Sequence, residues 1–248
     1  MGVIHANLFS DALQMHISYT AILPEGMEGP YPVLYLLHGL SDDDHAWLHQ
    51  TSLVRYAQKR KVAIFMPQAH RSFYTDMKHG GKYWTFISEE FPQKMNRLFR
   101  ISTKREDTFV AGLSMGGYGA FKLASAYPER FHKAASFSGA VDIALSWSKD
   151  QSRDDLFGDI YGTLEQFESS DDNLFTLFNK RRDNKIKPSF YLACGTDDFV
   201  LDGNRHFYET FKNDYDLLYV EEPGDHNWEF WDRHILLALE WMGIEKVK

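Results

Sequence analysis

The residues Gly112-Leu113-Ser114-Met115-Gly116 have the pattern G-x-S-x-G and stand where the character of the sequence changes. An apolar run, Thr108-Phe109-Val110-Ala111, comes directly before them and predicts a buried strand, and residues 115–126 after them predict a helix. The glycines beside the serine permit a tight connection where strand and helix pass closely. The sequence therefore predicts a strained strand-turn-helix that exposes the Ser114 hydroxyl as a nucleophile.

Apolar runs rich in β-branched and aromatic residues alternate with helical patterns along the chain. Runs that are apolar on both faces are typical of buried parallel strands. We expect strands at 33–37, 62–66, 108–111, 134–138, 190–194 and 217–220, and helices at 47–59, 92–99, 115–126, 205–212 and 228–242. This order predicts an α/β fold with a mostly parallel central sheet and helices on both faces.

Residues 6–10 and 15–23 flank Asp11-Ala12 and predict an antiparallel pair of strands at the N-terminal edge of the sheet. No internal repeat and no Gly/Ser-rich or Pro-rich linker divides the sequence, so we expect residues 1–248 to form a single domain. Residues 68–87 and 146–173 do not follow the alternation and predict functional loops. The second of these segments is a candidate small cap or loop insertion.

Composition and charge argue against several classes of protein. Hydrophobic residues make up 44% and charged residues 25% of the chain, as in ordinary globular proteins. A formal net charge of -8 argues against binding to nucleic acid or to an anionic membrane surface. Cys194 is the only cysteine, so no intramolecular disulfide can form. Together with the absence of a signal-like N-terminus, this predicts a cytoplasmic protein without a membrane segment.

A serine nucleophile needs a positioned base, which in turn is oriented by a third group. In a fold of this kind the order along the chain is serine, then acid, then histidine. His226 follows the strand at 217–220 and is the predicted base. Asp198 follows the strand at 190–194 and is the preferred acid, but its neighbour Asp197 leaves the same strand and stays open as the alternative, with Asp202 as a weaker third candidate.

The negative oxygen of a tetrahedral intermediate needs preorganised donors. One donor is the backbone N–H of the residue after the nucleophile, which is Met115. The other should come from the loop after an earlier strand, where His38-Gly39-Leu40 follows 33–37, and we choose the N–H of Leu40. We expect His38 itself to be structural, with its ring and its carbonyl holding this loop in place.

Metal and nucleotide motifs are not matched. His45 and His49 have the spacing of a zinc-protease helix but lack its glutamate, and Asp42, Asp43 and Asp44 do not follow the spacing of a calcium loop. We interpret these three acids as negative charge and caps at a helix N-terminus. The glycines after Ser114 fit neither a phosphate-binding loop nor a dinucleotide fingerprint. No metal ligand and no cofactor is therefore predicted.

Four motifs together resemble the esterase D-like branch of the α/β-hydrolases, and within it the bacterial tributyrin esterases. They are Leu36-Leu37-His38-Gly39-Leu40, residues 112–120, Cys194-Gly195-Thr196-Asp197-Asp198-Phe199, and residues 224–231. The resemblance implies the α/β-hydrolase fold, no cofactor and a carboxylesterase that acts on short acyl chains. The resemblance also implies that Ser114, His226 and Asp198 form the triad and that the N–H groups of Leu40 and Met115 form the oxyanion hole. It is also compatible with a homo-oligomer.

The predicted function is that of a serine carboxylesterase for a small-molecule ester. Related thioesterases, the S-formylglutathione hydrolases, and carbohydrate deacetylases use the same triad and are the alternatives. Tyr118 stands where S-formylglutathione hydrolases typically have histidine, and His38-Gly39-Leu40 replaces their Ser-Gly-Leu form, so specificity for glutathione thioesters is not supported. A non-catalytic binding protein is disfavoured because every triad residue is present. The predicted substrate-binding residues are the aromatic side chains Phe73, Tyr74, Trp84 and Trp228.

Overall fold

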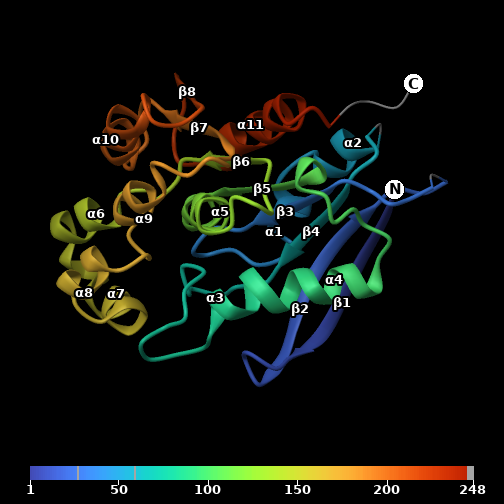
Figure 1. The fold of residues 1–248 in the computed structure, drawn as a ribbon, viewed down its shortest axis with the longest axis horizontal. Helices are drawn as coiled ribbons and strands as arrows, with labels where there is room; N and C mark the ends of the chain where they lie inside the picture. The colour runs from blue at the N-terminus through green and yellow to red at the C-terminus, as the bar shows by residue number, and fades with distance from the viewer. Residues whose placement is uncertain (27, 59, 245–248) are drawn as a thin grey trace.

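The computed structural model describes residues 1–26, 28–58 and 60–244, and its centre is a twisted eight-stranded sheet (Figure 1). The strand order is β1-β2-β4-β3-β5-β6-β7-β8. The strands are β1 Gly2–Ser10, β2 Met15–Leu23, β3 Val33–Leu37, β4 Ala63–Pro67, β5 Thr108–Leu113, β6 Lys133–Phe137, β7 Ser189–Gly195 and β8 Leu217–Glu222.

The six strands from β3 to β8 pair in parallel, whereas β1 pairs with β2, and β2 with β4, in the antiparallel sense. The β1–β2 hairpin places Leu8 opposite Ile17 at the sheet edge. The predicted mostly parallel sheet with antiparallel N-terminal edge strands is thus confirmed. Because β3, β5, β7 and β8 run in the same direction, the loops after them open on one common edge.

Helices cover both faces of the sheet. They are α1 Ala46–Gln50, α2 Leu53–Ala57, α3 Tyr83–Thr85, α4 Phe91–Leu98, α5 Met115–Ala126, α6 Ile143–Lys149, α7 Asp154–Tyr161, α8 Leu164–Ser169, α9 Leu174–Arg181, α10 Leu201–Phe211 and α11 Trp228–Trp241. A π-helical turn, Phe86–Glu90, leads into α4, and 3₁₀ turns lie at Arg105–Asp107 and Gln151–Arg153.

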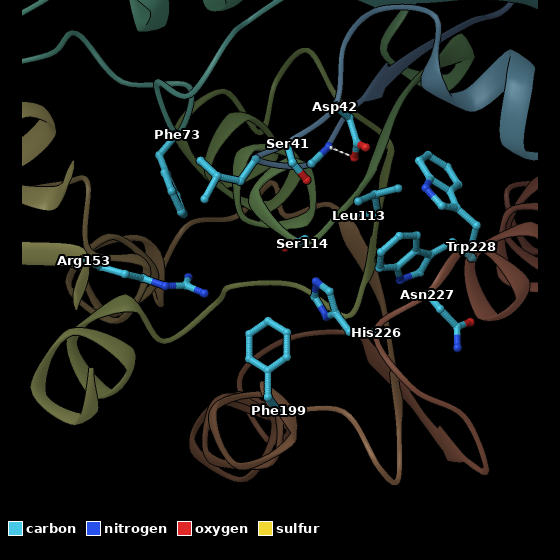
Figure 2. Close-up of a pocket in the computed structure, with 13 residues that line it drawn as sticks. Ser41, Asp42, Phe73, Leu113, Ser114, Arg153, Phe199, His226, Asn227 and Trp228 are labelled. Atoms are coloured by element: carbon cyan, nitrogen blue, oxygen red, sulfur yellow. Dashed lines mark hydrogen bonds between the residues drawn. The ribbon is translucent and has the colours of Figure 1, made fainter. Parts of the chain in front are cut away.

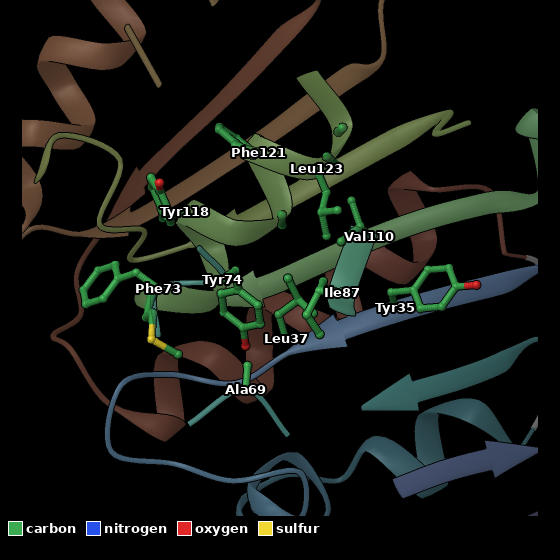
Figure 3. Close-up of a cluster of buried hydrophobic side chains, with 14 of the residues drawn as sticks. Tyr35, Leu37, Ala69, Phe73, Tyr74, Ile87, Val110, Tyr118, Phe121 and Leu123 are labelled. Carbon is green, nitrogen blue, oxygen red and sulfur yellow. The ribbon is translucent and has the colours of Figure 1, made fainter. Parts of the chain in front are cut away.

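Strand β3 shows how the sequence divides the core into two. Val33, Tyr35 and Leu37 enter the core on the face covered by α4, α5 and α9. Leu34 and Leu36 enter the core on the other face, under α1, α2 and α11. Alternate side chains of a strand point to opposite faces, so this entirely apolar run buries both sides of the sheet. Figure 3 shows the first core, where side chains of β3, β5 and α5 meet around Tyr74.

The expected helix at 47–59, of which position 59 lies outside the described residues, is wrong, because the structure has two helices there, α1 and α2. Thr51 between them is extended, and its hydroxyl donates to the carbonyl of Trp47 and accepts from the N–H of Leu53. The N–H of Ser52 donates to Asp232 of α11 at 2.7 Å. Side chains that bond to nearby backbone groups compete with helical hydrogen bonds, and the long-range contact with α11 completes the break.

Residues 146–173, which the sequence sets apart from the alternation, are helical here. They take in the end of α6, the 3₁₀ turn at Gln151–Arg153, and helices α7 and α8. Phe157 and Tyr161 of α7 are buried against the ring of Phe73, with centroid separations of 5.4 and 6.4 Å. This helical segment therefore packs onto the loop at 68–76. No helix in the described part of the chain has the length and apolar character needed to cross a membrane.

Candidate active site

Ser114 lies in a sharp turn between β5 and α5. Its backbone has φ 51° and ψ −117°, a conformation that costs a residue with a side chain on the order of 1–3 kcal/mol. The N–H of Ser114 donates to the carbonyl of Phe137 at 2.9 Å, and the N–H of Ala140 donates to the carbonyl of Ser114 at 3.0 Å. Strand β6 and the loop after it therefore hold the strained turn.

The glycines on either side of Ser114 are required by close backbone contacts. A Cβ on Gly112 would lie 2.4 Å from the carbonyl carbon of Gly116. A Cβ on Gly116 would lie 2.4 Å from the carbonyl oxygen of Leu37. Backbone atoms cannot rotate out of the way as a side chain can, so neither position accepts alanine without displacing β3, β5 or α5. The predicted strained strand-turn-helix is confirmed.

His226 lies in the loop between β8 and α11 and is paired with Asp198, which follows β7. The Nδ1 atom of His226 is 2.9 Å and 3.0 Å from the two carboxylate oxygens of Asp198. With the proton on Nδ1, His226 donates to the carboxylate and its Nε2 is left as an acceptor. The Asp198 side chain is fully buried and also accepts the N–H of Val200 at 3.1 Å. The aspartate therefore fixes the orientation of the imidazole.

The structure separates the three acids that the sequence left open. Asp197, adjacent to Asp198, is exposed and its carboxylate accepts from Thr196 at 3.4 Å. Asp202 lies in the first turn of α10 and pairs with Lys149 at 3.0 Å. Of these carboxylates, only that of Asp198 contacts His226.

Two aromatic rings flank the imidazole of His226. The ring of Phe199 lies 4.4 Å away between centroids, and the ring of Trp231 meets it edge-on at 5.0 Å. The indole N–H of Trp231 donates to the Ser138 hydroxyl at 3.0 Å, which fixes that ring. Phe199, in contrast, is 66% exposed. Of the two rings beside His226, that of Trp231 is therefore held in place, whereas that of Phe199 is exposed to solvent.

The loop after β3 carries the predicted oxyanion donor Leu40 and is held by His38. The ring of His38 is buried; Nδ1 donates to the carbonyl of Gly39 at 2.7 Å and Nε2 accepts the N–H of Ala69 at 2.9 Å. Burial lowers the pKa of His38, which keeps the ring neutral and able to accept. Its carbonyl accepts the Tyr74 hydroxyl at 2.9 Å. The prediction that His38 is structural is confirmed.

Asp42 adds a further restraint to the same loop. Its carboxylate accepts the N–H of Gly39 at 3.1 Å, and burial raises its pKa above the usual value. Asp43 accepts the N–H of His45, and Asp44 accepts the hydroxyls of Ser18 and Thr20 of β2. The interpretation of these acids as caps and charge of a helix N-terminus is therefore wrong, because α1 has no acidic residue in its first turn and its N-cap, His45, makes no capping bond.

Met115, the other predicted oxyanion donor, is the first residue of α5. A backbone N–H at this position has no acceptor within its own helix, and the helix dipole favours negative charge there. Helix α5 begins directly behind Ser114, so this donor end lies at the nucleophile. The start of α5 is thus suited to bind an oxyanion.

Ser114, His226 and Leu40 line one cavity of about 420 Å³ (Figure 2). Its other lining residues are Gly39, Ser41, Asp42, Phe73, Leu113, Arg153, Phe199, Asn227, Trp228 and Trp231. In Figure 2 the imidazole of His226 lies between Ser114 and the ring of Phe199. The cavity thus joins the candidate nucleophile, the candidate base and the loop that carries a candidate oxyanion donor.

Of the predicted substrate-binding residues, Phe73 and Trp228 line this cavity, but Tyr74 and Trp84 do not. The ring of Tyr74 is fully buried in the core and its hydroxyl is used by His38. The Trp84 ring stacks on Tyr127 at 5.9 Å and lines a separate hollow. A role in substrate binding remains a prediction for Phe73 and Trp228.

Sequence reasoning missed Arg153, Phe199 and Asp42 as cavity residues. Arg153 comes from the helical segment at 146–173, which is far from the triad in sequence and has no motif of its own. Phe199 directly follows Asp198, so that motif contained a signal for it. The N–H of Gly39 is bound by Asp42 only three residues later, a turn pattern that is readable in principle.

The histidines considered as metal ligands are on the surface beside β1. The rings of His45 and His49 stack with centroids 5.9 Å apart, and His5 stacks on His45 at 4.7 Å. Among residues 1–26, 28–58 and 60–244, no cluster of three or more side chains suited to hold a metal ion is found. These histidines lie outside the lining of the active-site cavity.

The fold is of the α/β-hydrolase type, and the solved structures that it resembles include serine hydrolases. The Esterase family model matches residues 10–242. The acetyl esterase of Caldicellulosiruptor saccharolyticus is 31% identical over 98% of this chain and 98% of its own length. A fluorophosphonate-binding serine hydrolase of Staphylococcus aureus, FphF, solved with substrate bound, has a TM-score of 0.90 and 31% identity, covering 97% of this chain and 98% of its own.

The S-formylglutathione hydrolase of Staphylococcus aureus is similar as well, with a TM-score of 0.87 and 32% identity over 97% of this chain and 98% of its own. The chain belongs to the Esterase family and is a carboxylic ester hydrolase, in agreement with the esterase D-like resemblance of its motifs.

Proposed function

We propose that this protein is a serine carboxylesterase that hydrolyses short-chain acyl esters through Ser114, His226 and Asp198. The observation that carries the proposal is that His226, which lines the same cavity as Ser114, is paired with a fully buried Asp198. A histidine oriented in this way can take a proton at Nε2 while Nδ1 remains bonded to the carboxylate.

The reaction proceeds in two steps. Ser114 Oγ attacks the ester carbonyl carbon as its proton passes to His226 Nε2, and the carbonyl oxygen becomes an oxyanion that accepts the N–H groups of Leu40 and Met115. The oxyanion collapses, the bond to the alcohol breaks, and the alcohol leaves with the proton from His226. Water then attacks the acyl-enzyme in the same way, which releases the carboxylic acid and restores Ser114.

The preference for short acyl chains rests on the shape of the cavity and on a relative. The large rings of Trp228 and Trp231 line the cavity and contact each other edge-on at 5.1 Å. Bulky fixed rings leave room for a small acyl group better than for a long one. The relative named acetyl esterase supports the same preference.

A thioesterase of the S-formylglutathione hydrolase type is the second candidate, because a solved relative of that name is 32% identical. The residue that departs from that group, Tyr118, is buried and donates to the carbonyl of Asp172 at 2.7 Å rather than lining the cavity. Comparison of kcat/KM for a thioester and an oxygen ester with the same acyl group separates the two. A carbohydrate deacetylase with this triad is tested by adding an acetylated sugar to that comparison.

We also propose a single α/β-hydrolase domain, in which residues 146–173 form a small cap, and a cytoplasmic location without nucleic-acid or membrane partners. Support comes from the net charge of -8 and from Cys194, which is buried and is the only cysteine of the sequence. A homo-oligomer is part of the proposal on the resemblance alone. Measurement of the molar mass in solution tests it.

The experiment that tests the activity is hydrolysis of p-nitrophenyl esters from acetate to octanoate by wild type and Ser114→Ala. We expect the highest kcat/KM at the short end and its loss in Ser114→Ala. Ser125→Ala is the matched control, because Ser125 is a buried serine near the far end of α5, and its hydroxyl has no hydrogen-bond partner among the described residues. Activity that survives Ser114→Ala in a pure preparation would overturn the proposal.

A further inference from the structure

Arg153 brings a positive charge to the candidate active site. It ends the 3₁₀ turn before α7 and lines the cavity together with Ser114 and His226. Figure 2 shows its guanidinium reaching toward the middle of the cavity, across from Trp228. Its side chain is 35% exposed, so a bound ligand would shield the charge further from water.

The ion pair of Arg153 leaves part of the guanidinium available. Arg153 Nε is 3.5 Å from Asp150 Oδ2. Within the described residues, Arg153 forms its ion pair with this carboxylate through Nε. Asp150 also accepts the N–H and the hydroxyl of Ser152, and these hydrogen bonds lower its pKa. The two Nη groups of Arg153 remain as donors in the planar geometry that matches a carboxylate.

The cavity is polarised because its other charged lining residue is an acid. Asp42 lies on the side away from Arg153, where its carboxylate is bonded to Gly39 (Figure 2). An anionic group on a substrate would be repelled by Asp42 and attracted by Arg153. The two charges thus define one orientation for an anionic ligand.

The position of Arg153 relative to His226 indicates which part of the ester it faces. The leaving group must lie beside His226, which gives it a proton. The ring of Phe199 is 4.4 Å from His226, and the guanidinium carbon of Arg153 is 5.9 Å from the centre of that ring. A leaving group that follows the face of Phe199 away from His226 therefore arrives at Arg153.

A second space adjoins the active-site cavity at Arg153 and Phe199. Arg153 and Phe199 also line this neighbouring hollow of about 160 Å³, which Lys149, Asp150 and Asp202 line as well. Lys149 is paired with Asp202 at 3.0 Å. The pair Arg153 and Phe199 thus forms the boundary between the active-site cavity and a second space on the leaving-group side.

We propose that Arg153 binds a carboxylate carried by the leaving group, so that the preferred substrates are esters of anionic alcohols or phenols. This inference rests on the proposed function, and it names the substrate class for that same site. The ester bond that breaks is the one attacked by Ser114, and Arg153 takes no proton in the reaction.

The test compares two acetate esters that differ in one charge, 4-acetoxybenzoate and methyl 4-acetoxybenzoate. Both give the same acetyl-enzyme, so the ratio of their kcat/KM values reports the leaving-group side. We expect Arg153→Gln to lower this ratio about fivefold, the size of a partly exposed charge pair, and Arg153→Lys to retain part of it. Added salt should weaken the wild-type preference. Arg182→Gln is the control, since Arg182 pairs with Asp214 outside the cavity and its loss changes the net charge equally.

Binding to Ser114→Ala protein separates this inference from the proposed function, because no turnover is needed. We expect 4-acetoxybenzoate to bind this variant more tightly than its methyl ester, and the difference to disappear when Arg153→Gln is added. Equal binding of the two compounds, or a ratio unchanged by Arg153→Gln, overturns the inference even if the esterase is active. p-Nitrophenyl hydrogen glutarate carries its carboxylate on the acyl group instead. If Arg153→Gln lowers kcat/KM only for this ester, the assignment of Arg153 to the leaving group is also overturned.

Discussion

The hydroxyl of Tyr74 donates a 2.9 Å hydrogen bond to the carbonyl oxygen of His38, two residues before the candidate oxyanion donor Leu40. Tyr74 itself has a positive φ of 51° and is fully buried, so its position is set by the core rather than by solvent. The bond ties the loop at 68–76 to the loop after β3. A core side chain thus takes part in placing a group of the active site.

Removal of this hydroxyl should impair catalysis more than folding. We expect Tyr74→Phe to lower the free energy of unfolding by about 0.5–1.5 kcal/mol, the usual net value of one hydrogen bond. Displacement of the Leu40 N–H should lower kcat about tenfold with little change in KM. Tyr215→Phe is the control, because its hydroxyl donates to the carbonyl of Phe178 away from the cavity. It should cost similar stability and leave kcat unchanged; equal kcat in the two variants contradicts the positioning role.

Two adjacent aspartates provide a matched test of the acid. Asp198→Asn should lower kcat/KM by about 10²–10⁴-fold, because an amide no longer holds His226 in the required tautomer. Asp197→Asn removes an exposed carboxylate that does not contact His226 and should stay within about twofold of wild type. Steady-state kinetics of both variants decide between them. A larger loss in Asp197→Asn is the result that contradicts the pairing.

Two glycines should respond in opposite directions to alanine. Gly116→Ala places a Cβ 2.4 Å from the Leu37 carbonyl oxygen, and we expect it to cost about 1–3 kcal/mol or more of stability and to lower activity. Gly158 lies in α7, and a Cβ added there would meet no atom within 4 Å. Gly158→Ala should raise stability by about 0.5–1 kcal/mol because alanine favours the helix. Thermal and urea unfolding measure both, and a stabilising Gly116→Ala would refute the close contact.

The free energy of unfolding should fall as the pH is lowered through about 6.5, the pKa of free histidine. Burial lowers the pKa of His38 in the folded protein, so below that region the unfolded chain binds a proton that the folded chain does not. Protonation therefore favours unfolding as the pH falls, and the stabilisation is recovered as the pH rises. His132 and His234, whose pKa values burial also lowers, act in the same direction.

His38→Gln isolates the contribution of this ring. The variant should be less stable at neutral pH, since the Ala69 N–H loses one of its two acceptors, the other being Gln68 Oε1. Its loss of stability between pH 7 and pH 5 should be smaller than that of wild type. His16→Gln is the control because His16 is exposed on β2, and it should keep the wild-type slope. Urea unfolding at a series of pH values gives the slopes. An unchanged slope in His38→Gln would show that this ring does not carry the effect.

Several of these features were readable from the sequence because they depend on local pattern. The apolar runs predicted the parallel strands, and 115–126 matched α5 to the residue. The G-x-S-x-G turn predicted the strained Ser114, since glycine is required where backbone meets backbone. His226 and Asp198 could be chosen because each follows a strand that ends on the same edge of the sheet. Asp197 stayed open, as two successive residues in a turn differ only in the direction of their side chains.

By itself, then, the sequence determined the alternation of strands and helices, the nucleophile turn and the chain order of the candidate triad, because these depend on periodicity and on steric limits within a few residues. Only the tertiary structure decided that Asp198 rather than Asp197 contacts His226, that Tyr74 and Asp42 hold the loop of Leu40, that α1 and α2 are separate, and that Arg153 enters the cavity. Each of these depends on side chains that meet across distant segments, where spacing along the chain carries no information about direction or distance.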